Sequence, residues 1–579
     1  MNKENIEALV LQNLKKKVNE DNIETLVLED YENQFLFEKN KSNLDITFNR
    51  IAFIFFVFLI VSFIFSIKVV YLGSLTPNIK KNNFFVTKNN YRADILDNNN
   101  NFLVKTVTTI DIGIKPNFIK DKKKLIINLK LIFPEKNFDE INKKIDQKKF
   151  FYLEKKISQE KYAMLMLLSD KSIIPEEKLS RIYPQKNLFS HIIGQIDNDN
   201  NGISGIEKYF NNELISQKKS LKLTVDTDIQ FLIRKELIKA NIVFNNIGST
   251  AILMNVNNGE ILSMVSLPDY NLNKRDQIKD VNYINRATKA VYEFGSVFKT
   301  FTIAAALNDK LIEVNTKFVN LEKKIQCGKS IIGEYDDKIP SDLTVEEILI
   351  RSGNIGSVRI GQILGIEKLR DFLENIGVLG KIKFDIEEVA PARKFIWGKC
   401  KLATASFGHG ISTTALQVAK GYAILANGGF DIEPTLIKSK IDENHFKTRI
   451  VKKDTSEKIN LMLRKVVSTQ IGTAGLADVS GYEVGGKTGT AEKTKKGEYT
   501  RKKVNTFVAI FPTSKPKYVL LVLLDEPKTN SEYIYHYRDG KTPMKGTPRN
   551  TAGWTSVEVA GKIIEKIGPI LATKYMEIN

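Results

Sequence analysis

The chain has few of the residues that bind metals or build disulfide frameworks. Its 579 residues include two cysteines, Cys327 and Cys400, and four histidines that are scattered along the chain. Neither cysteine belongs to a C-x-x-C pair, and no group of histidines and cysteines has the spacing of a metal site. The sequence therefore predicts no metal and no cofactor. It leaves open whether the two cysteines pair, but the fold is not built on a disulfide.

The chain also lacks a compact basic patch with interleaved aromatic residues. Its net charge of +20 could favour an anionic neighbour, such as a membrane surface, a wall polymer or nucleic acid. Lys, Asn and Ile are abundant throughout, so the positive excess reads as compositional bias, and we expect no nucleic-acid partner. At 579 residues the chain is too long for one ordinary core, and two or three folded units are expected.

One long apolar run is present near the N-terminus. Residues 51–67 carry no charge, and after Lys68 the run continues to Leu72, which matches the roughly 20 residues that a bilayer requires. No small-residue cleavage site follows, so we predict a retained transmembrane anchor. The polar residues 1–50 are expected to form a largely disordered tail. This tail repeats the motif N-I-E-x-L-V-L, a possible pair of docking sites for a partner whose role stays open.

The rest of the chain changes character near residue 221. Residues 73–215 are lysine-rich and hold no evident catalytic cluster. Beyond them, two strands around Asn257-Asn258-Gly259 read as a hairpin. Two more strands, at 504–511 and 518–524, and a last helix at 557–571 complete the pattern of an α/β or α+β unit of about 360 residues.

The segment Val291–Leu307 organises this second part. It reads as a loop that breaks at Gly295 into a helix beginning near Ser296. On such a helix Ser296 and Lys299 share one face, one turn apart. Free N–H groups at a helix start can also stabilise an oxyanion. Alone this S-x-x-K pattern is weak, because it recurs three times in the chain, at Ser158, Ser216 and Ser514.

Two further motifs follow in order, and each occurs once in the chain. The first is S-x-N, in a break after the amphipathic stretch Leu343–Ile350. The second is K-T-G, after a strand-like Tyr482–Val484, and its glycine leaves no side chain between the strand and what lies against it. The residues of the two motifs are Ser352, Gly353, Asn354, Lys487, Thr488 and Gly489, followed by Thr490.

This ordered trio inside one predicted domain resembles the motif set of penicillin-binding proteins and serine β-lactamases. The resemblance covers nearly the whole chain after the anchor. Residues 92–97 and 205–207 look like the non-catalytic pedestal of class B penicillin-binding proteins. Residues 481–493 and 524–527 most resemble the division-specific septal transpeptidases, and no His-Ala-Trp-like segment of the elongation enzymes follows the K-T-G strand.

The resemblance implies a fold and a domain order. The expected fold is an α/β (α+β) serine transpeptidase or β-lactamase-like domain with a central antiparallel sheet and a helical subdomain. A pedestal of the dimerisation type and a single transmembrane helix precede it. The expected domains are a cytoplasmic tail at 1–50, the anchor at 51–72, the pedestal at 73–215 and the transpeptidase domain at 216–579.

The resemblance also implies roles. Ser296 would be the nucleophile that forms an acyl-enzyme with a stem peptide. Lys299 would be its base, and a second cation at Lys487 would help burial to lower the pKa of Lys299. Ser352 would relay a proton to the leaving nitrogen. Lys487 would complete the catalytic group and would hold the substrate carboxylate together with Thr488 and Thr490. Asn354 and Gly489 would also bind substrate, and the backbone N–H groups of Ser296 and Thr490 would form the oxyanion hole.

Three positions depart from the family pattern. Phe294 replaces the usual proline two residues before the nucleophile, and Gly353 replaces the middle serine of S-S-N. Residues 98–100 are three asparagines in place of Arg-Asn-Gly. The changes at Phe294 and Gly353 leave the reactive side chains of the motifs in place. At residues 98–100, asparagine can still make the turn that the family pattern requires.

The resemblance further implies partners and a location. The substrates would be peptidoglycan stem peptides or their lipid-linked precursor, and β-lactams would inhibit covalently. The protein would lie in the bacterial cytoplasmic membrane, at the division septum, with its catalytic domain outside. A membrane glycosyltransferase and other division proteins would be its partners. The alternatives are an elongation-type transpeptidase, a β-lactam hydrolase or sensor, and a catalytically idle scaffold.

Overall fold

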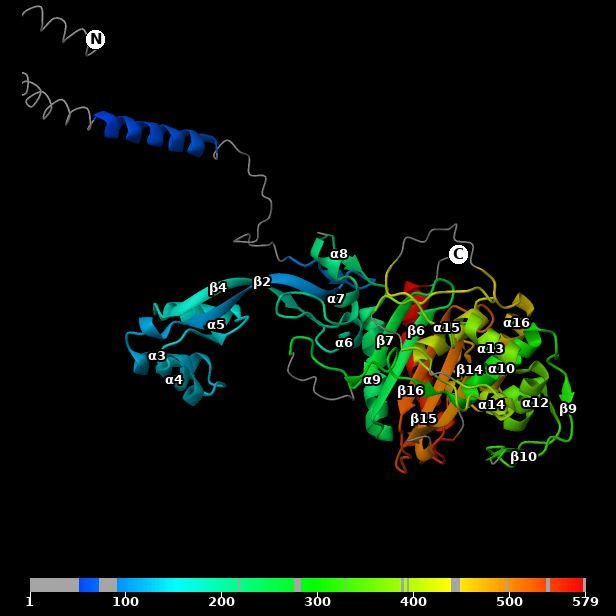
Figure 1. The fold of residues 1–579 in the computed structure, drawn as a ribbon. Helices are drawn as coiled ribbons and strands as arrows, with labels where there is room; N and C mark the ends of the chain where they lie inside the picture. Colours follow the sequence, from blue (N-terminus) through cyan, green and yellow to red (C-terminus); the bar gives the residue numbers. More distant parts are fainter. Residues whose placement is uncertain are drawn as a thin grey trace, which may run out of the picture. The chain divides into compact units, whose positions relative to one another are not determined.

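The computed structural model describes residues 52–71 and 91–575, apart from gaps at 217–218, 275–282, 329, 387–389, 393–394, 439–447, 496–497 and 538–541. The chain divides into two compact units, residues 1–89 and 90–579. The predicted tail with its repeated motif lies outside the described residues. In the first unit, Ala52–Tyr71 is one uninterrupted helix (Figure 1). It is long and apolar enough to cross a membrane, as the sequence predicted, and a helix satisfies its own backbone polar groups in lipid.

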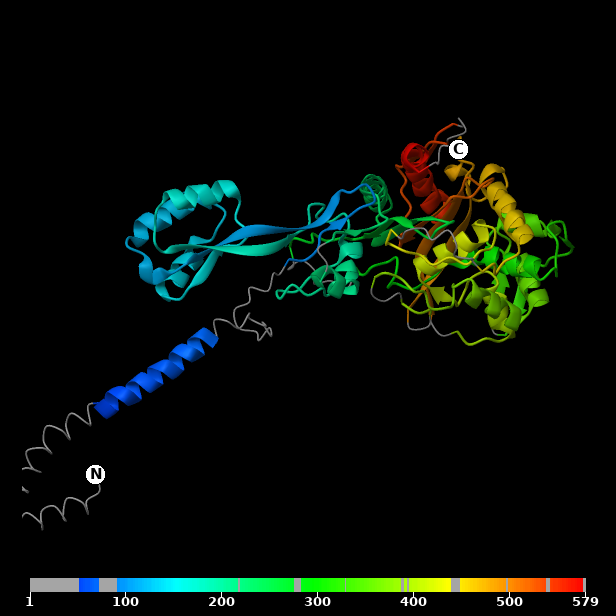
Figure 2. The same ribbon diagram turned by 90° about the horizontal axis from the view of Figure 1, so that it is seen from above.

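The second unit begins with an elongated pedestal (Figure 2). Its spine is a long antiparallel pair in which β2 and β4 run side by side from Lys105↔Ile182 to Ile114↔Ile173. The far end carries three helices on a small apolar core of its own. The elements of the pedestal are β1 (Ile95–Leu96), β2 (Phe102–Ile114), α3 (Lys122–Ile132), α4 (Phe138–Asp146), β3 (Phe151–Glu154), α5 (Gln159–Leu167), β4 (Ile173–Ile182), α6 (Ser190–Ile193), α7 (Gly205–Tyr209), α8 (Asn211–Ser216) and β5 (Leu221–Lys222).

A buried group of charges, which we call the root cluster, holds the near end of the pedestal together. Its members are Arg92, Arg181 and Glu207, all at most 4% exposed. Glu207 accepts from Arg92 Nε at 2.6 Å and from Arg181 Nε at 2.8 Å. Ala93 and Ile95 beside it belong to the same apolar core as the large domain. The boundary predicted between residues 215 and 216 stays a prediction.

The large domain is built on a five-stranded sheet in the order β14-β15-β16-β6-β7, with every pair antiparallel. All eight residues of β16 are buried, because helices cover both faces of the sheet. Helices α9 and α17 pack on one face, and α15 and α16 pack on the other. This confirms the predicted central antiparallel sheet. The strands are β6 (Gly248–Asn255), β7 (Ile261–Leu267), β14 (Gly485–Lys495), β15 (Glu498–Phe511) and β16 (Tyr518–Asp525), and the flanking helices are α9 (Thr227–Phe244), α15 (Ala415–Ala426), α16 (Lys453–Ser468) and α17 (Ser556–Lys574).

A helical subdomain lies beside the β14 edge (Figure 1). Its centre is α10, in which every residue except the last is buried. The elements of the subdomain include β8 (Tyr292–Glu293), α10 (Phe298–Asn308), β10 (Lys324–Cys327), β11 (Ser330–Gly333), α11 (Val345–Arg351), α12 (Asn354–Leu364), α13 (Ile366–Asn375), α14 (Lys399–Ala405) and β13 (Ser412–Thr413).

One local prediction is wrong. Residues 482–484 are not a strand, and β14 begins only at Gly485. Gly481 and Glu483 both have positive φ, 84° and 44°, which no strand residue adopts. The K-T-G residues therefore lie inside the strand and not after it.

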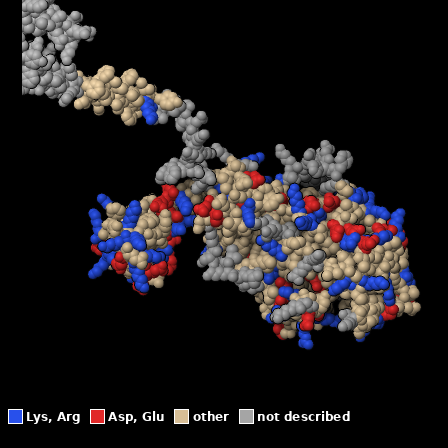
Figure 3. Space-filling model, viewed as in Figure 1, with Lys and Arg blue, Asp and Glu red and all other residues tan. Residues whose placement is uncertain are grey.

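The surface agrees with compositional bias as the source of the net charge. In Figure 3, Lys and Arg are dispersed over the pedestal head and the large domain with Asp and Glu among them. The face in view carries no compact basic patch.

Candidate active site

Ser296 lies in a single turn of 3-10 helix, Gly295–Val297, that leads into α10. The α-helix predicted to begin near Ser296 therefore begins two residues later, at Phe298. Gly295 has a φ of 53°, and a Cβ there would lie 2.8 Å from the carbonyl oxygen of Thr490, so only glycine fits the bend. Ser296 is partly exposed, whereas Lys299, one turn on, is fully buried.

The S-x-N residues form the turn between α11 and α12. Ser352 ends α11 in the left-handed region, with a φ of 62° and a ψ of 41°. A non-glycine residue in this region is uncommon and is held in place by its surroundings. The turn points the side chains of Ser352 and Asn354 towards Lys299. The Nζ of Lys299 donates to Asn354 Oδ1 at 2.7 Å, to Ser352 Oγ at 3.2 Å and to the Ser352 carbonyl oxygen at 2.5 Å.

The K-T-G strand β14 is the edge strand of the sheet and lies against the serine turn. A Cβ on Gly489 would lie 2.1 Å from the Phe294 carbonyl oxygen, so the close approach requires a glycine. Lys487 Nζ donates to Ser352 Oγ at 2.9 Å. Thr490 Oγ1 accepts from the N–H of Ala552 at 2.9 Å.

Lys299 and Lys487 are both 0% exposed, and the hydroxyl of Ser352 lies between their two nitrogens. Burial lowers the pKa of Lys299 to about 7, and the carboxylate of Glu334 opposes that shift. Burial, and then the charge of Lys299, lowers the pKa of Lys487 well below its ordinary value. A lysine with a pKa near 7 is neutral often enough at neutral pH to take a proton from a hydroxyl.

The structure thus brings together residues from three distant segments. Lys299, Ser352, Asn354 and Lys487 form one hydrogen-bonded group, and the edge strand places Gly489 against the serine turn. Thr488 is 7% exposed, and its hydroxyl pairs with that of Thr473 at 2.8 Å. The two lysines are buried, whereas Ser296, Asn354 and Thr490 are partly exposed and accessible to a substrate.

Sequence reasoning missed Glu334. It follows β11, and its carboxylate accepts from the backbone N–H groups of Asn354 at 2.6 Å and Ile355 at 2.9 Å. Twenty residues separate the partners, and no motif marked the glutamate.

His409 is one of the four scattered histidines, and the sequence analysis did not assign it to the site. Burial, and then the charge of Lys299, lowers its pKa to about 4, so the imidazole is neutral. Within the part of the chain that the structure describes, its buried Nδ1 has no hydrogen-bond partner. Its ring stands edge-on to Tyr499 with centroids 5.9 Å apart.

Ser158 shows what an accidental S-x-x-K match looks like. Its hydroxyl caps α5 by accepting from the N–H of Lys161 at 3.3 Å, and Lys161 pairs with Glu135 at the surface. An S-x-x-K pattern is therefore not evidence of a catalytic site unless another segment of the chain packs against its serine and lysine.

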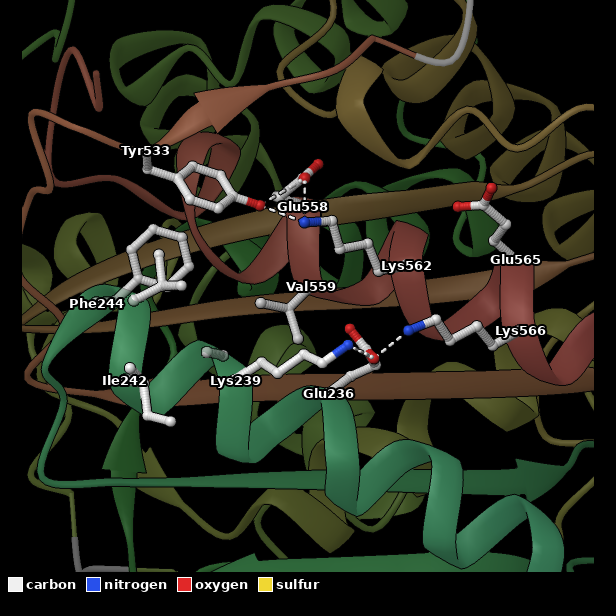
Figure 4. Close-up of a pocket in the computed structure, with 12 residues that line it drawn as sticks. Glu236, Lys239, Ile242, Phe244, Tyr533, Glu558, Val559, Lys562, Glu565 and Lys566 are labelled. Carbon is white, nitrogen blue, oxygen red and sulfur yellow. Dashed lines mark hydrogen bonds and ion pairs between the residues drawn. The ribbon is translucent and has the colours of Figure 1, made fainter. Parts of the chain in front are cut away.

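A separate hollow of about 520 Å³ lies between α9 and α17 (Figure 4). Five of its charged side chains pair with one another. Glu236 accepts from Lys239 and Lys566, and Glu558 accepts from Lys562 and Tyr533. Because these charges compensate each other and none belongs to the three motifs, we do not assign the reaction to this hollow.

Comparison with known proteins gives matches over most of the chain. A family model described as the penicillin binding protein transpeptidase domain matches residues 249–541, and one described as the penicillin-binding protein dimerisation domain matches residues 87–240. The chain is similar to the probable peptidoglycan D,D-transpeptidase FtsI of Caulobacter vibrioides, with 30% identity over 498 residues, which is 83% of this chain and 82% of the relative. It is also similar to stage V sporulation protein D of Bacillus subtilis, with 28% identity over 76% of this chain and 75% of the relative.

Proposed function

This chain belongs to the family of penicillin-binding proteins with a transpeptidase domain, and within that family we propose that it is the septal D,D-transpeptidase of cell division, with Ser296 as its nucleophile. It is a peptidoglycan D,D-transpeptidase of class B. The observation that carries the site assignment is the pair of buried lysines, Lys299 and Lys487, whose nitrogens both donate to Ser352 Oγ. Lys299 lies one turn from the partly exposed Ser296.

In the first half of the proposed reaction, Ser296 Oγ attacks the carbonyl carbon of the penultimate D-Ala of a donor stem peptide. Neutral Lys299 takes the hydroxyl proton. A serine hydroxyl is a poor nucleophile without such a base, and a pKa near 7 suits Lys299 to the role. The C–N bond then breaks, and a proton passes through Ser352 Oγ to the leaving nitrogen of the terminal D-Ala.

The remaining residues bind and orient the donor. Lys487, Thr488 and Thr490 hold the terminal carboxylate, and Asn354 orients the peptide amide. The N–H groups of Ser296 and Thr490 stabilise the tetrahedral oxyanion, where one donor contributes about 3 to 4 kcal/mol. Gly489 supports this assignment, because a side chain there would collide with the serine turn.

In the second half, the amine of a neighbouring stem peptide attacks the acyl-enzyme, and Ser296 regains its proton as the cross-link forms. Attack by water instead would give carboxypeptidase activity. A β-lactam acylates the same hydroxyl: its lactam C–N bond breaks, but the leaving nitrogen stays tethered to the acyl group through the opened ring and blocks the attacking amine.

The division role is supported by the resemblance of residues 481–493 and 524–527 to the septal enzymes. The apolar helix Ala52–Tyr71 supports a single-pass anchor, with the catalytic domain outside the cytoplasm, where the wall precursor lies. Polymerisation of the glycan would come from a membrane glycosyltransferase, because nothing in residues 73–215 resembles such a site.

The test is mass spectrometry of the full-length protein after incubation with penicillin. We expect a stable adduct on Ser296 and no adduct in Ser296→Ala. Ser158→Ala is the matched control, because it removes the serine of an accidental S-x-x-K and should label normally. An adduct at another residue would overturn the assignment, and rapid turnover of penicillin would favour the hydrolase. A fluorescent fusion that labels the side wall instead of the septum would favour the elongation enzyme.

A further inference from the structure

Three consecutive residues hold the turn that carries Ser352. The carbonyl oxygen of Gly333 accepts from the side-chain amide of Asn354 at 2.8 Å. The carboxylate of Glu334 accepts from the first two N–H groups of α12. The hydroxyl of Tyr335 donates to the carbonyl oxygen of Arg351 at 3.0 Å. Residues 333–335, which we call the clamp, therefore grip the turn on both sides of Ser352.

The clamp sets which way Asn354 faces. Because the amide nitrogen of Asn354 donates to Gly333, its oxygen is the atom left to face Lys299, whose Nζ lies 2.7 Å away. Backbone bonds from Asn354 and Ile355 to Glu334 fix the start of α12 in the same place. The clamp therefore holds Asn354 at its side-chain nitrogen and at its backbone N–H, which points the side-chain oxygen at the Lys299 nitrogen.

The clamp is fastened at its other end. It continues from the hairpin β10–β11, which pairs from Lys324↔Gly333 to Cys327↔Ser330. At the tip of the hairpin, Cys327 forms a disulfide with Cys400 in α14. The pairing that the sequence left open thus ties the hairpin to the helical subdomain.

Glu334 also supplies charge. Lys299 faces Lys487 on β14, His409 after α14 and Glu334 beside α12, and of these only Glu334 is an anion. Its carboxylate raises the pKa of Lys299 against the effect of burial. Two residues along the chain from Glu334, Asp336 forms an ion pair with Arg549 at 3.7 Å.

We propose that Glu334, the central residue of the clamp, is a positioning residue of the acylation step and acts through Asn354 and Lys299. The inference rests on the proposed role of Lys299 as the base.

The experiment measures the rate of acylation by penicillin in the full-length protein, from about pH 5 to about pH 9. The rate rises with pH as Lys299 loses its proton. In Glu334→Gln the charge that favours protonated Lys299 is gone, so the midpoint of that rise moves to lower pH by about one unit. The plateau falls several-fold, because a neutral amide holds α12 and Asn354 less firmly.

Two variants separate charge from position. Glu334→Asp keeps the charge on a shorter arm, so its midpoint stays in place while its plateau falls. Glu347→Gln is the matched control, since this carboxylate caps the start of α11 by accepting from the N–H of Thr344 at 2.9 Å. Glu347→Gln should lower the free energy of unfolding but leave the pH midpoint of the acylation rate unchanged.

The outcomes are distinct. A Glu334→Gln protein with the midpoint and plateau of the unaltered chain overturns the inference. If that variant does not fold, Tyr335→Phe decides, because the clamp predicts a lower plateau at the same midpoint and an unchanged plateau overturns it. Failure of the proposed function looks different, since the unaltered chain would then form no adduct on Ser296 at any pH.

Discussion

Among the residues that the structure describes, two pairs of buried cations each share one acceptor side chain, and the two acceptors differ in charge. In the root cluster, Arg92 and Arg181 share the carboxylate of Glu207. Both guanidinium groups donate to further acceptors, including the Asn211 side chain at 2.9 Å and the hydroxyl of Thr106 at 2.9 Å. Within the described residues, Nη2 of Arg181 has no hydrogen-bond partner. In the active site, Lys299 and Lys487 share the neutral hydroxyl of Ser352.

The difference shows how one fold uses burial for two purposes. A carboxylate between two guanidinium groups forms charge-assisted hydrogen bonds that join separate chain segments. A hydroxyl between two ammonium groups leaves the cost of burial uncompensated, so the pKa of each lysine falls. Removing the carboxylate from the first arrangement should be destabilising, because two buried cations would lose their anion. The second arrangement is expected to supply the proposed base at neutral pH at the expense of stability.

The largest expected effect comes from removing the base. Lys299→Met should lower the rate of penicillin acylation by about 1000-fold, the usual contribution of a general base. Folding should not suffer, because an apolar chain of similar length replaces a buried cation that lacks a carboxylate partner. Adduct formation and the unfolding midpoint measure the two effects. Lys161→Met is the control from the accidental motif, and acylation that survives within tenfold would contradict the role of Lys299.

Removing the shared carboxylate of the root cluster should lower stability and leave the acylation rate unchanged. Glu207→Gln leaves two buried arginines without an anion, so the free energy of unfolding should fall by about 3 to 5 kcal/mol. The molecules that stay folded should acylate at the normal rate. Denaturant unfolding gives the first quantity. Glu135→Gln, which breaks an exposed pair with Lys161, should leave the unfolding midpoint in place. A Glu207→Gln protein of normal stability would contradict the comparison.

Removing the shared hydroxyl should have a smaller catalytic effect. Ser352→Ala leaves Lys299 in place but breaks the path between the two lysines and the leaving nitrogen. We expect acylation to fall by about 100-fold, the lower range for a proton-transfer group. Stopped-flow labelling measures it, and Ser406→Ala, which removes a buried hydroxyl that bonds within α14, is the control. An unchanged rate would mean that no proton passes through Ser352.

The smallest expected effect is a slope of stability with pH. The pKa of Lys299 is about 7 in the folded chain against 10.5 for a fully hydrated lysine, so between these values the unfolded chain binds more protons. The free energy of unfolding should therefore rise as pH increases through this window. The measurement is the difference between the unaltered chain and Lys299→Met, which removes the contribution of Lys299. Equal slopes in the two proteins would contradict a lowered pKa.

Much of the fold could be predicted from the sequence, because its signals are local. The apolar helix, the hairpin of β6 and β7 around Asn257-Asn258-Gly259, strands β15 and β16 and the last helix follow from hydrophobic pattern and turn residues. The strand predicted at 482–484 was wrong because positive φ values at Gly481 and Glu483 depend on the packing of the turn around them.

Within the candidate site, the sequence by itself determined the spacing of Ser296 and Lys299, since helical geometry places residues three apart on one face. It also supplied the ordered motifs that indicate the family. Only the tertiary structure decided that Ser352 lies between two lysines, that Glu334 holds the turn and that Cys327 pairs with Cys400. The reason is that burial and charge act through space: the proton affinity of a lysine depends on groups tens to hundreds of residues away, which no local pattern records.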